Sequence, residues 1–400
     1  MLLSALALTL APAPVVEGGP SPVEQGKPHS HTHAGDETDE DTEPLLFEVT
    51  YTSELIGNAA GGIKRGARYL DNLDIVFEAD MEAVAGWTGA TVNIYGLYNN
   101  GNSIGDLVGD AQAVSNIETG VRAFRLYEAW IDQKFGENVS LRAGLYDLNS
   151  EFDALDASGL FVSSPHGIGT DFAQSGENGP SIFPVTSLAA RLQVTPAEGW
   201  AVRVAVLDAV PGDPNRPART VVRLGNGEGA LLVGEVEAPL GEGRLIAGHW
   251  RYTAAFDRTD GMGAETGNAG SYVRAEVPLT HRADGKIDGF MRLGTASGRF
   301  NMFDFFASTG LKFTGWIPGR GEDEFGVALA AAFTAEPYRA ATGASPAEIA
   351  VEATYRTQLT PWLAVQPNIH YIRRPSADPT IADALVLGIR TEISFDLFNL

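Results

Sequence analysis

Residues 148–186 of the chain read LNSEFDALDASGLFVSSPHGIGTDFAQSGENGPSIFPVT. Gly, Pro, Ser and Asn are so frequent here that neither a helical nor an alternating period lasts more than a few residues, which indicates a loop. A structureless connection of this length is unusual in a compact domain and is normally either functional or disordered. It nevertheless carries the apolar side chains Phe152, Leu155, Leu160, Phe161, Val162, Phe172, Ile182 and Phe183. We therefore expect a long loop that folds inward against the wall of a barrel.

The sequence on both sides of this loop has the alternating pattern of β-strands. In Val139–Asp147, for example, Leu141 and Leu145 are apolar while Ser140 and Arg142 are polar, which is the period of a strand with one apolar face. The same pattern predicts sixteen strands, near residues 45–54, 73–83, 90–99, 122–135, 139–147, 187–195, 200–208, 230–238, 243–252, 271–278, 286–295, 303–314, 323–334, 348–358, 362–372 and 384–396.

The connections between these strands differ in length in a regular way. Short turns at Gly136–Asn138, Pro196–Gly199, Pro239–Glu242 and Leu359–Pro361 alternate with longer loops at 55–72, 100–121, 148–186, 209–229, 253–270 and 373–383. An even number of strands, with short turns at one rim and long loops at the other, is typical of a bacterial outer-membrane barrel. The predicted fold is all-β: a transmembrane antiparallel β-barrel of about 16 strands with long inward-folded loops.

A soluble β-sandwich or propeller is the alternative, because its strands also alternate. Two observations favour the membrane barrel. Lys is nearly absent from the predicted strands, and aromatic residues stand near strand ends, where a membrane interface is expected. These aromatic residues are Trp87, Trp200, Trp250, Tyr252, Tyr371 and Phe395. The last strand, at 384–396, keeps one apolar face and is expected to close the barrel against the first.

Composition excludes several other classes of protein. The net charge of -23 argues against a nucleic-acid partner, which needs a basic face. The chain has no cysteine, so disulfides and thiolate metal sites are excluded. No stretch approaches the roughly 18 consecutive apolar residues of a membrane helix. If the chain spans a bilayer, it must do so with strands closed into a barrel.

The first residues have a different composition from the rest. Residues 1–14 resemble the apolar core of a secretory signal peptide, although the positively charged n-region is missing. Residues 15–44 are predicted to be a flexible acidic segment rich in Pro and Gly. Its three histidines, His29, His31 and His33, are interpreted as solvated side chains rather than a loose metal site. The barrel domain is predicted to span residues 45–400.

If the apolar faces meet lipid, the polar faces line a lumen in which acidic and basic residues are unevenly distributed. Fixed charges set selectivity in channels, although many of these groups should be ion pairs that hold the wall together. Arg, carboxylate and aromatic side chains near the long loop provide hydroxyl-binding groups and ring faces suited to sugars. The predicted channel-lining residues are Glu128, Trp130, Asp132, Arg142, Tyr146, Glu151, Asp153, Arg191 and Arg203. No metal and no cofactor is predicted.

Several motifs resemble those of the carbohydrate-selective porin family, often called OprB-type. They are RLYEAW at 125–130, LRAG at 141–144, FVSSPHG at 161–167, NGPSIFP at 178–184, WRYT at 250–253 with FDR at 256–258, and YRTQLTPWLAVQP at 355–367. The resemblance implies a sixteen-stranded outer-membrane barrel, narrowed by long inward loops, that takes up sugars such as glucose by diffusion. It also implies that Glu128 and Arg142 line the channel. The family often has Asn-Ser-Pro-Phe where this chain has Ser163–His166.

The predicted function is therefore passive, sugar-selective diffusion of mono- or small oligosaccharides across the bacterial outer membrane. A general diffusion or anion-selective porin is the main alternative. An enzyme is not expected, because there is no Gly-x-Ser-x-Gly elbow and the strand histidines His249 and His370 have no placed nucleophile beside them. The expected partners are small sugars, outer-membrane lipid and the barrel-assembly machinery, with the chain either a monomer or a homotrimer.

Overall fold

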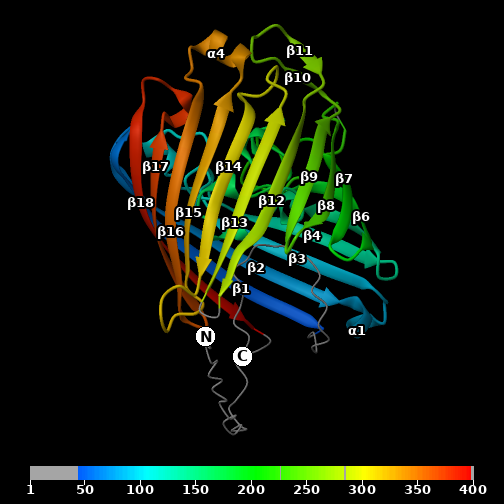
Figure 1. Cartoon of the computed structure of the whole chain (residues 1–400). Helices are drawn as coiled ribbons and strands as arrows, with labels where there is room; N and C mark the ends of the chain where they lie inside the picture. Colours follow the sequence, from blue (N-terminus) through cyan, green and yellow to red (C-terminus); the bar gives the residue numbers. More distant parts are fainter. Residues whose placement is uncertain (1–43, 226, 283–284, 398–400) are drawn as a thin grey trace, which may run out of the picture.

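A computed structural model describes residues 44–225, 227–282 and 285–397. Its long strands form one closed antiparallel barrel (Figure 1). They are β1 (Leu45–Gly62), β2 (Gly66–Asp80), β3 (Ala90–Asn99), β4 (Ala123–Lys134), β5 (Val139–Tyr146), β6 (Ser187–Ala197), β7 (Trp200–Asp208), β8 (Ala230–Leu240), β9 (Gly243–Tyr252), β12 (Ala269–Arg282), β13 (Gly285–Ala296), β14 (Phe303–Thr314), β15 (Glu324–Thr334), β16 (Ala347–Thr360), β17 (Leu363–Arg373) and β18 (Ala382–Asp396). The expected signal peptide and most of the acidic segment lie outside the described residues.

The prediction of sixteen strands is confirmed, and so is closure by the last strand. β18 pairs with β1 in antiparallel register, for example Tyr51 with Ile393, and no strand of the ring is left as an edge. Closure matters because an open sheet edge would leave backbone donors and acceptors without partners inside a bilayer.

Two predictions about the first strands were wrong. The loop expected at 55–72 is a short turn, since β1 continues to Gly62 and β2 begins at Gly66. The strand expected to reach residue 83 ends at Asp80, whose side chain caps the short helix α1 (Met81–Ala85) by accepting a hydrogen bond from Glu82 N at 2.8 Å. The alternating pattern of the sequence continues past Asp80, but a carboxylate at the N-cap position favours the start of a helix.

The wall of the barrel is polar on the inside and apolar on the outside. On β1, Glu54 is fully buried while the neighbouring Leu55 is 56% exposed. On β7, Arg203 is buried while Val202, Val204 and Val206 are exposed. This distribution is the reverse of that in a soluble protein and suits a wall that faces lipid. In the described residues, no helix is long and apolar enough to cross a membrane.

The long connections gather at one end of the barrel (Figure 1). That end carries α4 (Glu336–Thr342) and a small hairpin of β10 (Ala255–Asp257) and β11 (Ala264–Thr266). α1 lies at the opposite end, where most turns are short. The predicted difference between the two rims is therefore present, apart from the first connection.

Two of the predicted interface aromatics face inward instead. Trp87, Trp200, Tyr371 and Phe395 are exposed, as expected for the outer face, whereas Trp250 and Tyr252 are fully buried. The alternation of β9 explains the correction: Trp250 and Tyr252 share the inward face, so Arg251 and His249 point outward. At this end of β9 the polar side chains His249 and Arg251 are therefore on the outer face. Arg251 therefore does not line the interior of the barrel.

The long segment after β5 contains only short helical turns, in agreement with the sequence. These are η1 (Leu148–Ser150), η2 (Ala157–Leu160), η3 (Ser164–His166) and α3 (Thr170–Ala173). Its apolar side chains join one core with inward-facing aromatic residues of the wall, and the Phe172 ring stacks on Trp250 with 5.0 Å between ring centroids. This core is the reason a segment without regular structure is held in place.

Candidate functional site

The long segment is fixed to the far wall by buried ion pairs. Asp153 lies between two arginines of neighbouring strands: its Oδ1 is 3.2 Å from Arg274 Nη1, and its Oδ2 is 2.8 Å from Arg292 Nη2. Arg292 also reaches Asp171 Oδ1 at 2.5 Å. All four side chains are almost completely buried. Removing one partner of such a pair leaves an uncompensated buried charge, so these contacts strongly restrain the segment.

Carboxylates of the wall also bind backbone amides of the segment. Glu235 on β8 accepts from Asp153 N at 2.8 Å, Glu276 on β12 from Ala157 N at 2.8 Å, and Glu352 on β16 from Val162 N at 2.7 Å. An irregular segment has many backbone donors, and each one buried without a partner costs about 1–3 kcal/mol. Acidic residues on the inner wall therefore supply the acceptors that a helix or sheet would otherwise provide.

The preceding loop, at 100–122, is attached in the same way. Glu348 on β16 accepts from the backbone amides of Ala111 at 2.8 Å and Gln112 at 3.0 Å. Glu54 on β1 accepts from Ser115 Oγ at 2.7 Å. Both loops thus contact the inner faces of strands on several sides of the barrel, and together they leave only part of its interior open.

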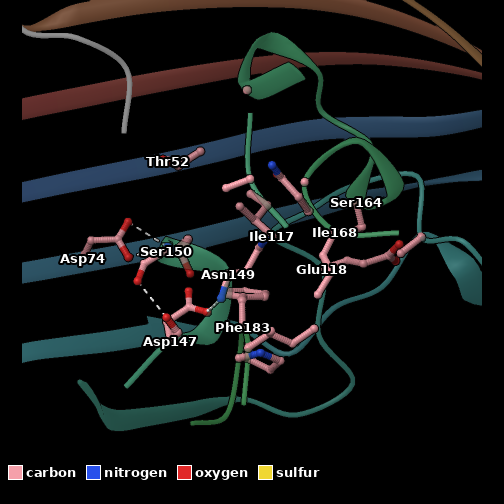
Figure 2. Close-up of a pocket in the computed structure, with 18 of the residues that line it drawn as sticks. Thr52, Asp74, Ile117, Glu118, Asp147, Asn149, Ser150, Ser164, Ile168 and Phe183 are labelled. Carbon is pink, nitrogen blue, oxygen red and sulfur yellow. Dashed lines mark hydrogen bonds between the residues drawn. The ribbon is translucent and has the colours of Figure 1, made fainter. Parts of the chain in front are cut away.

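A cavity of about 460 Å³ lies between these two loops and the inner faces of β1 to β4 and β18. Figure 2 shows Asp74 and Asp147 on one side of this cavity and Glu118 on the other. Its polar lining residues include Thr50, Thr52, Asn72, Asp74, Tyr95, Asn116, Glu118, Tyr127, Asp147, Asn149, Ser150, Ser158, Ser164, Arg390 and Glu392. We call this space the chamber.

Two tyrosine and aspartate pairs form one side of the chamber. Tyr95 donates its hydroxyl to Asp74 Oδ1 at 2.5 Å, and Tyr127 donates to Asp147 Oδ2 at 2.6 Å. The two tyrosine rings meet edge to face with 4.9 Å between centroids. The Phe183 ring lies 6.5 Å from that of Tyr127. Ring faces, hydroxyls and carboxylates therefore lie next to one another on a single surface.

A β-bulge brings Tyr127 to this position. Tyr95 pairs with Glu128 and the next residue, Gly96, pairs with Leu126, so Tyr127 is the extra residue on β4. Because of it, both Tyr127 and Glu128 face the interior. Such an insertion re-aims side chains at one point of a strand.

A second cavity of about 220 Å³ adjoins the chamber on the side of the long loops. Its lining includes Arg125, Asp213 and Arg219, and we call it the vestibule. The two cavities share the lining residues Ala173, Ile182, Phe183 and Pro184. Phe183 and its neighbours therefore form the boundary between chamber and vestibule.

Five of the predicted site residues form one network beside the start of the long segment. Asp132 is 3.0 Å from Arg142 Nε and 2.7 Å from Arg191 Nη2, while Glu151 is 2.7 Å from Arg191 and accepts a short hydrogen bond from Tyr146. A sixth, Trp130, lies under this network, with the Arg142 guanidinium 3.8 Å from the centroid of its ring. The structure thus brings together residues that sequence reasoning had grouped.

The other predicted residues have separate positions. Asp153 lies in the arginine clamp described above, and Arg203 is 3.1 Å from Glu235 and 2.9 Å from Glu237. Glu128 accepts from Asp147 N at 2.7 Å. None of the nine predicted residues is among the described residues that line the chamber.

Sequence reasoning missed the residues that do line the chamber wall, above all Asp74, Tyr95, Tyr127 and Asp147. Asp74 lies on the polar face of β2, but nothing in the sequence indicates which part of that face the loops leave open. Tyr127 was hidden by the bulge. A signal was available for Asp147. An Asp side chain in a turn often accepts a hydrogen bond from the backbone amide two residues further on. Asp147 accepts such a bond from Asn149 N at 2.8 Å.

Burial affects the carboxyl groups of the connecting segments that line the chamber. It raises the pKa of Asp147 to about 6, against the hydrogen bonds that this carboxyl accepts from Tyr127 and Asn149. Burial also raises the pKa of Glu118, although Ser103 and backbone amides donate hydrogen bonds to it. The charge of the chamber therefore depends on pH near neutrality.

Comparison with known proteins agrees with this architecture. Residues 64–395 match the family described as carbohydrate-selective porin, OprB family. A curated relative, Porin B of Pseudomonas aeruginosa, is 24% identical over 412 residues, and the match covers 87% of this chain and 87% of that protein. The high-pH structure of Pseudomonas putida OprB has a TM-score of 0.77 at 20% identity, covering 88% of this chain and 94% of that chain. Its low-pH structure has a TM-score of 0.57 at 18% identity, covering 88% and 93%.

The closed sixteen-stranded barrel, with its apolar outer face and loop-filled interior, defines an outer-membrane porin. The chain belongs to the carbohydrate-selective porin family, OprB. Its place is the bacterial outer membrane, and its function is that of a sugar-selective channel.

Proposed function

We propose that sugars cross this porin through the vestibule, pass Phe183 and enter the chamber beside the two tyrosine and aspartate pairs. The residues that line both cavities support this route, because they place the vestibule directly beside the chamber. The chamber volume of about 460 Å³ lies in the range of small-molecule sites, roughly 300–1,000 Å³. It suits a mono- or small oligosaccharide.

The chemistry of the chamber wall carries this proposal. Sugar hydroxyls both donate and accept hydrogen bonds, and Asp74, Asp147 and Asn149 offer carboxylate and amide groups for them. The C–H face of a pyranose ring is apolar and packs against aromatic rings, which Tyr127 and Phe183 provide. Binding by these groups requires no charge on the solute.

For the nine residues predicted from the sequence, we propose a role in channel shape. Glu128 binds the backbone amide of Asp147, which holds the Asp147 carboxylate toward the chamber. The network of Asp132, Arg142 and Arg191 holds Glu151 and so fixes the point at which the long segment turns inward. Changes in these residues are expected to affect sugar passage by moving the loop.

The competing interpretation of the chamber is that it holds no preferred position for a sugar. In that case the barrel would conduct in the manner of a general diffusion or anion-selective porin. Current through single channels in planar bilayers distinguishes the two. Block by millimolar glucose or a disaccharide indicates a sugar site, and ionic current insensitive to sugars indicates a general porin.

Tyr127→Phe tests the proposed position of the sugar, because it removes the hydroxyl that binds Asp147 and keeps the ring. We expect weaker glucose block with an assembled barrel. Tyr69→Phe is the matched control: Tyr69 is exposed, and its hydroxyl bonds to Tyr51 on the outer face. If Tyr127→Phe and Tyr69→Phe leave block equally unchanged, the sugar does not use this wall. Swelling of proteoliposomes in a panel of sugars then ranks the substrates.

A further inference from the structure

The chamber lining contains more acidic than basic side chains. Its charged residues are Asp74, Glu118, Asp147, Arg390 and Glu392. Two of these are neutralised by wall residues: Arg390 lies 3.0 Å from Glu54, and Glu392 lies 2.9 Å from Arg356. The excess of negative charge therefore comes from the carboxylates of the connecting loops and of β2.

The two loop carboxylates have no basic partner. Within the described residues, no Lys, Arg or His nitrogen lies within the 4.0 Å ion-pair distance of Asp147 or Glu118. Glu128 places a second carboxylate beside Asp147, where it accepts the Asp147 amide. On Glu118, Oε1 is buried and has no hydrogen-bond partner among the described residues. Neutral donors hydrogen-bond to both groups, Tyr127 and Asn149 to Asp147, and Ser103 and backbone amides to Glu118, but no cation beside them cancels their charge.

The vestibule has the opposite charge. Arg125 donates only to neutral oxygens, at 3.0 Å from Asn99 Oδ1 and 2.6 Å from Pro217 O. Arg219, the other arginine of the vestibule lining, has no carboxylate within 4.0 Å among the described residues. Asp213 is already occupied, because Arg216 lies 2.9 Å and Arg223 3.5 Å from its carboxylate.

We propose that the passage sorts sugars by charge, and that the chamber favours protonated amino sugars and neutral sugars over hexuronates and sugar phosphates. This rests on the proposed function, in which sugars pass through the chamber. A carboxylate or phosphate on the solute meets Asp147 and Glu118 across a few ångströms of partly dehydrated space, where like charges repel strongly. An ammonium group there replaces part of its lost hydration with the same carboxylates. The basic vestibule attracts anionic sugars without letting them proceed.

Uptake of labelled glucose, glucosamine and glucuronate by proteoliposomes at pH 7 tests the proposal, together with the reversal potential across a potassium chloride gradient. We expect cation selectivity, and uptake of glucuronate roughly tenfold slower than that of glucosamine at low ionic strength. Asp147→Asn and Glu118→Gln should each reduce this ratio roughly threefold.

Asn116→Lys adds the opposite charge without removing a contact, because the Asn116 side chain is exposed in the chamber lining and only its backbone amide bonds to Val162 O. It should shift the reversal potential toward anion selectivity and speed glucuronate uptake. Glu322→Gln makes the same change of charge as Glu118→Gln, but on an exposed residue of the turn after β14 that lines neither cavity. It should match the wild type. Folding of each variant is checked by the heat-modifiable mobility of the barrel on gels.

The glucose measurement separates failure of this inference from failure of the proposed function. Equal uptake of all three sugars with no ion selectivity overturns the charge sorting and leaves the sugar passage intact. Unchanged selectivity in both Asp147→Asn and Asn116→Lys also overturns it. If glucose itself does not enter, the proposed passage fails, and the inference fails with it.

Discussion

Arg292 on β13 holds Asp153 of the long segment in a two-pronged contact, with Nε 2.9 Å from Oδ1 and Nη2 2.8 Å from Oδ2. Both side chains are fully buried. The pair joins the loop after β5 to a strand on another part of the wall, so the position of the loop depends on it.

Asp153→Ala should release the long segment from this wall. The change leaves Arg292 and Arg274 buried with less compensating charge, at a cost of about 3–5 kcal/mol. We expect larger single-channel conductance and loss of sugar block, measured in planar bilayers, and faster proteolysis within the segment. Asp156→Ala is the control, because Asp156 is 56% exposed and its ion pair to Arg244 is at the surface of the segment. A variant of Asp153 with wild-type conductance and block would show that the clamp does not set the channel width.

Phe183→Ala should open the boundary between vestibule and chamber. The phenyl ring is part of the lining of both cavities and packs near Tyr127, so its removal widens the passage and takes away an apolar face for the sugar ring. We expect higher ion conductance and a weaker glucose block by roughly 1 kcal/mol, or about fivefold in affinity. Phe305→Ala on the outer face serves for comparison, since Phe305 is exposed and packs against Phe333. Equal conductance in both variants would place the narrow point elsewhere.

The sequence predicted the barrel well because its strands obey a simple physical rule. A wall between lipid and an aqueous interior needs alternating side chains, and β3, β7, β9 and β14 have the predicted bounds to the residue. The rule failed where a local interaction replaced it. Asp80 caps a short helix where the strand was expected to continue, and the loop expected at 55–72 is a short turn between Gly62 and Gly66.

The sequence predicted the chamber less well, for a different reason. Which inner residues stay accessible depends on where the loops settle, and that is decided by contacts over long separations in sequence, such as Asp153 with Arg292 and Val162 with Glu352. Periodicity carries no information about such pairs. The bulge at Tyr127 also reverses the inward and outward assignment on β4, which a period of two cannot represent.

Sugar passage should depend on pH around the pKa of Asp147, which burial raises to about 6. Above pH 6 the group is charged and accepts hydrogen bonds from sugar hydroxyls, and below pH 6 it takes up a proton and weakens cation attraction. We expect cation selectivity and glucose block to fall as pH is lowered from 7.5 to 5. Asp147→Asn should flatten this part of the profile. A profile that is the same in wild type and variant would assign the pH dependence to another group.

His166 should make the attachment of the long segment to the inner wall sensitive to acid. We call the attached segment docked. Its ring is buried between Phe161 and Phe290, with centroids at 5.0 and 5.9 Å, and neither ring nitrogen has a hydrogen-bond partner among the described residues. Burial lowers the pKa of His166 to about 4, with Glu352 opposing the shift and Arg274 adding to it.

Between pH 6.5 and pH 4 a released segment binds a proton on His166 and a docked one does not. Docking of the segment therefore becomes less favourable as pH falls through this window, by about 3 kcal/mol in total. His166→Phe fills the same apolar space without a titratable group, so it should keep the segment docked at pH 4. Fluorescence of Trp250, which stacks on Phe172 of the segment, reports release during an acid titration. His249→Phe, on the exposed outer face, should leave the titration unchanged, whereas an identical transition in wild type and His166→Phe would exclude His166 as its cause.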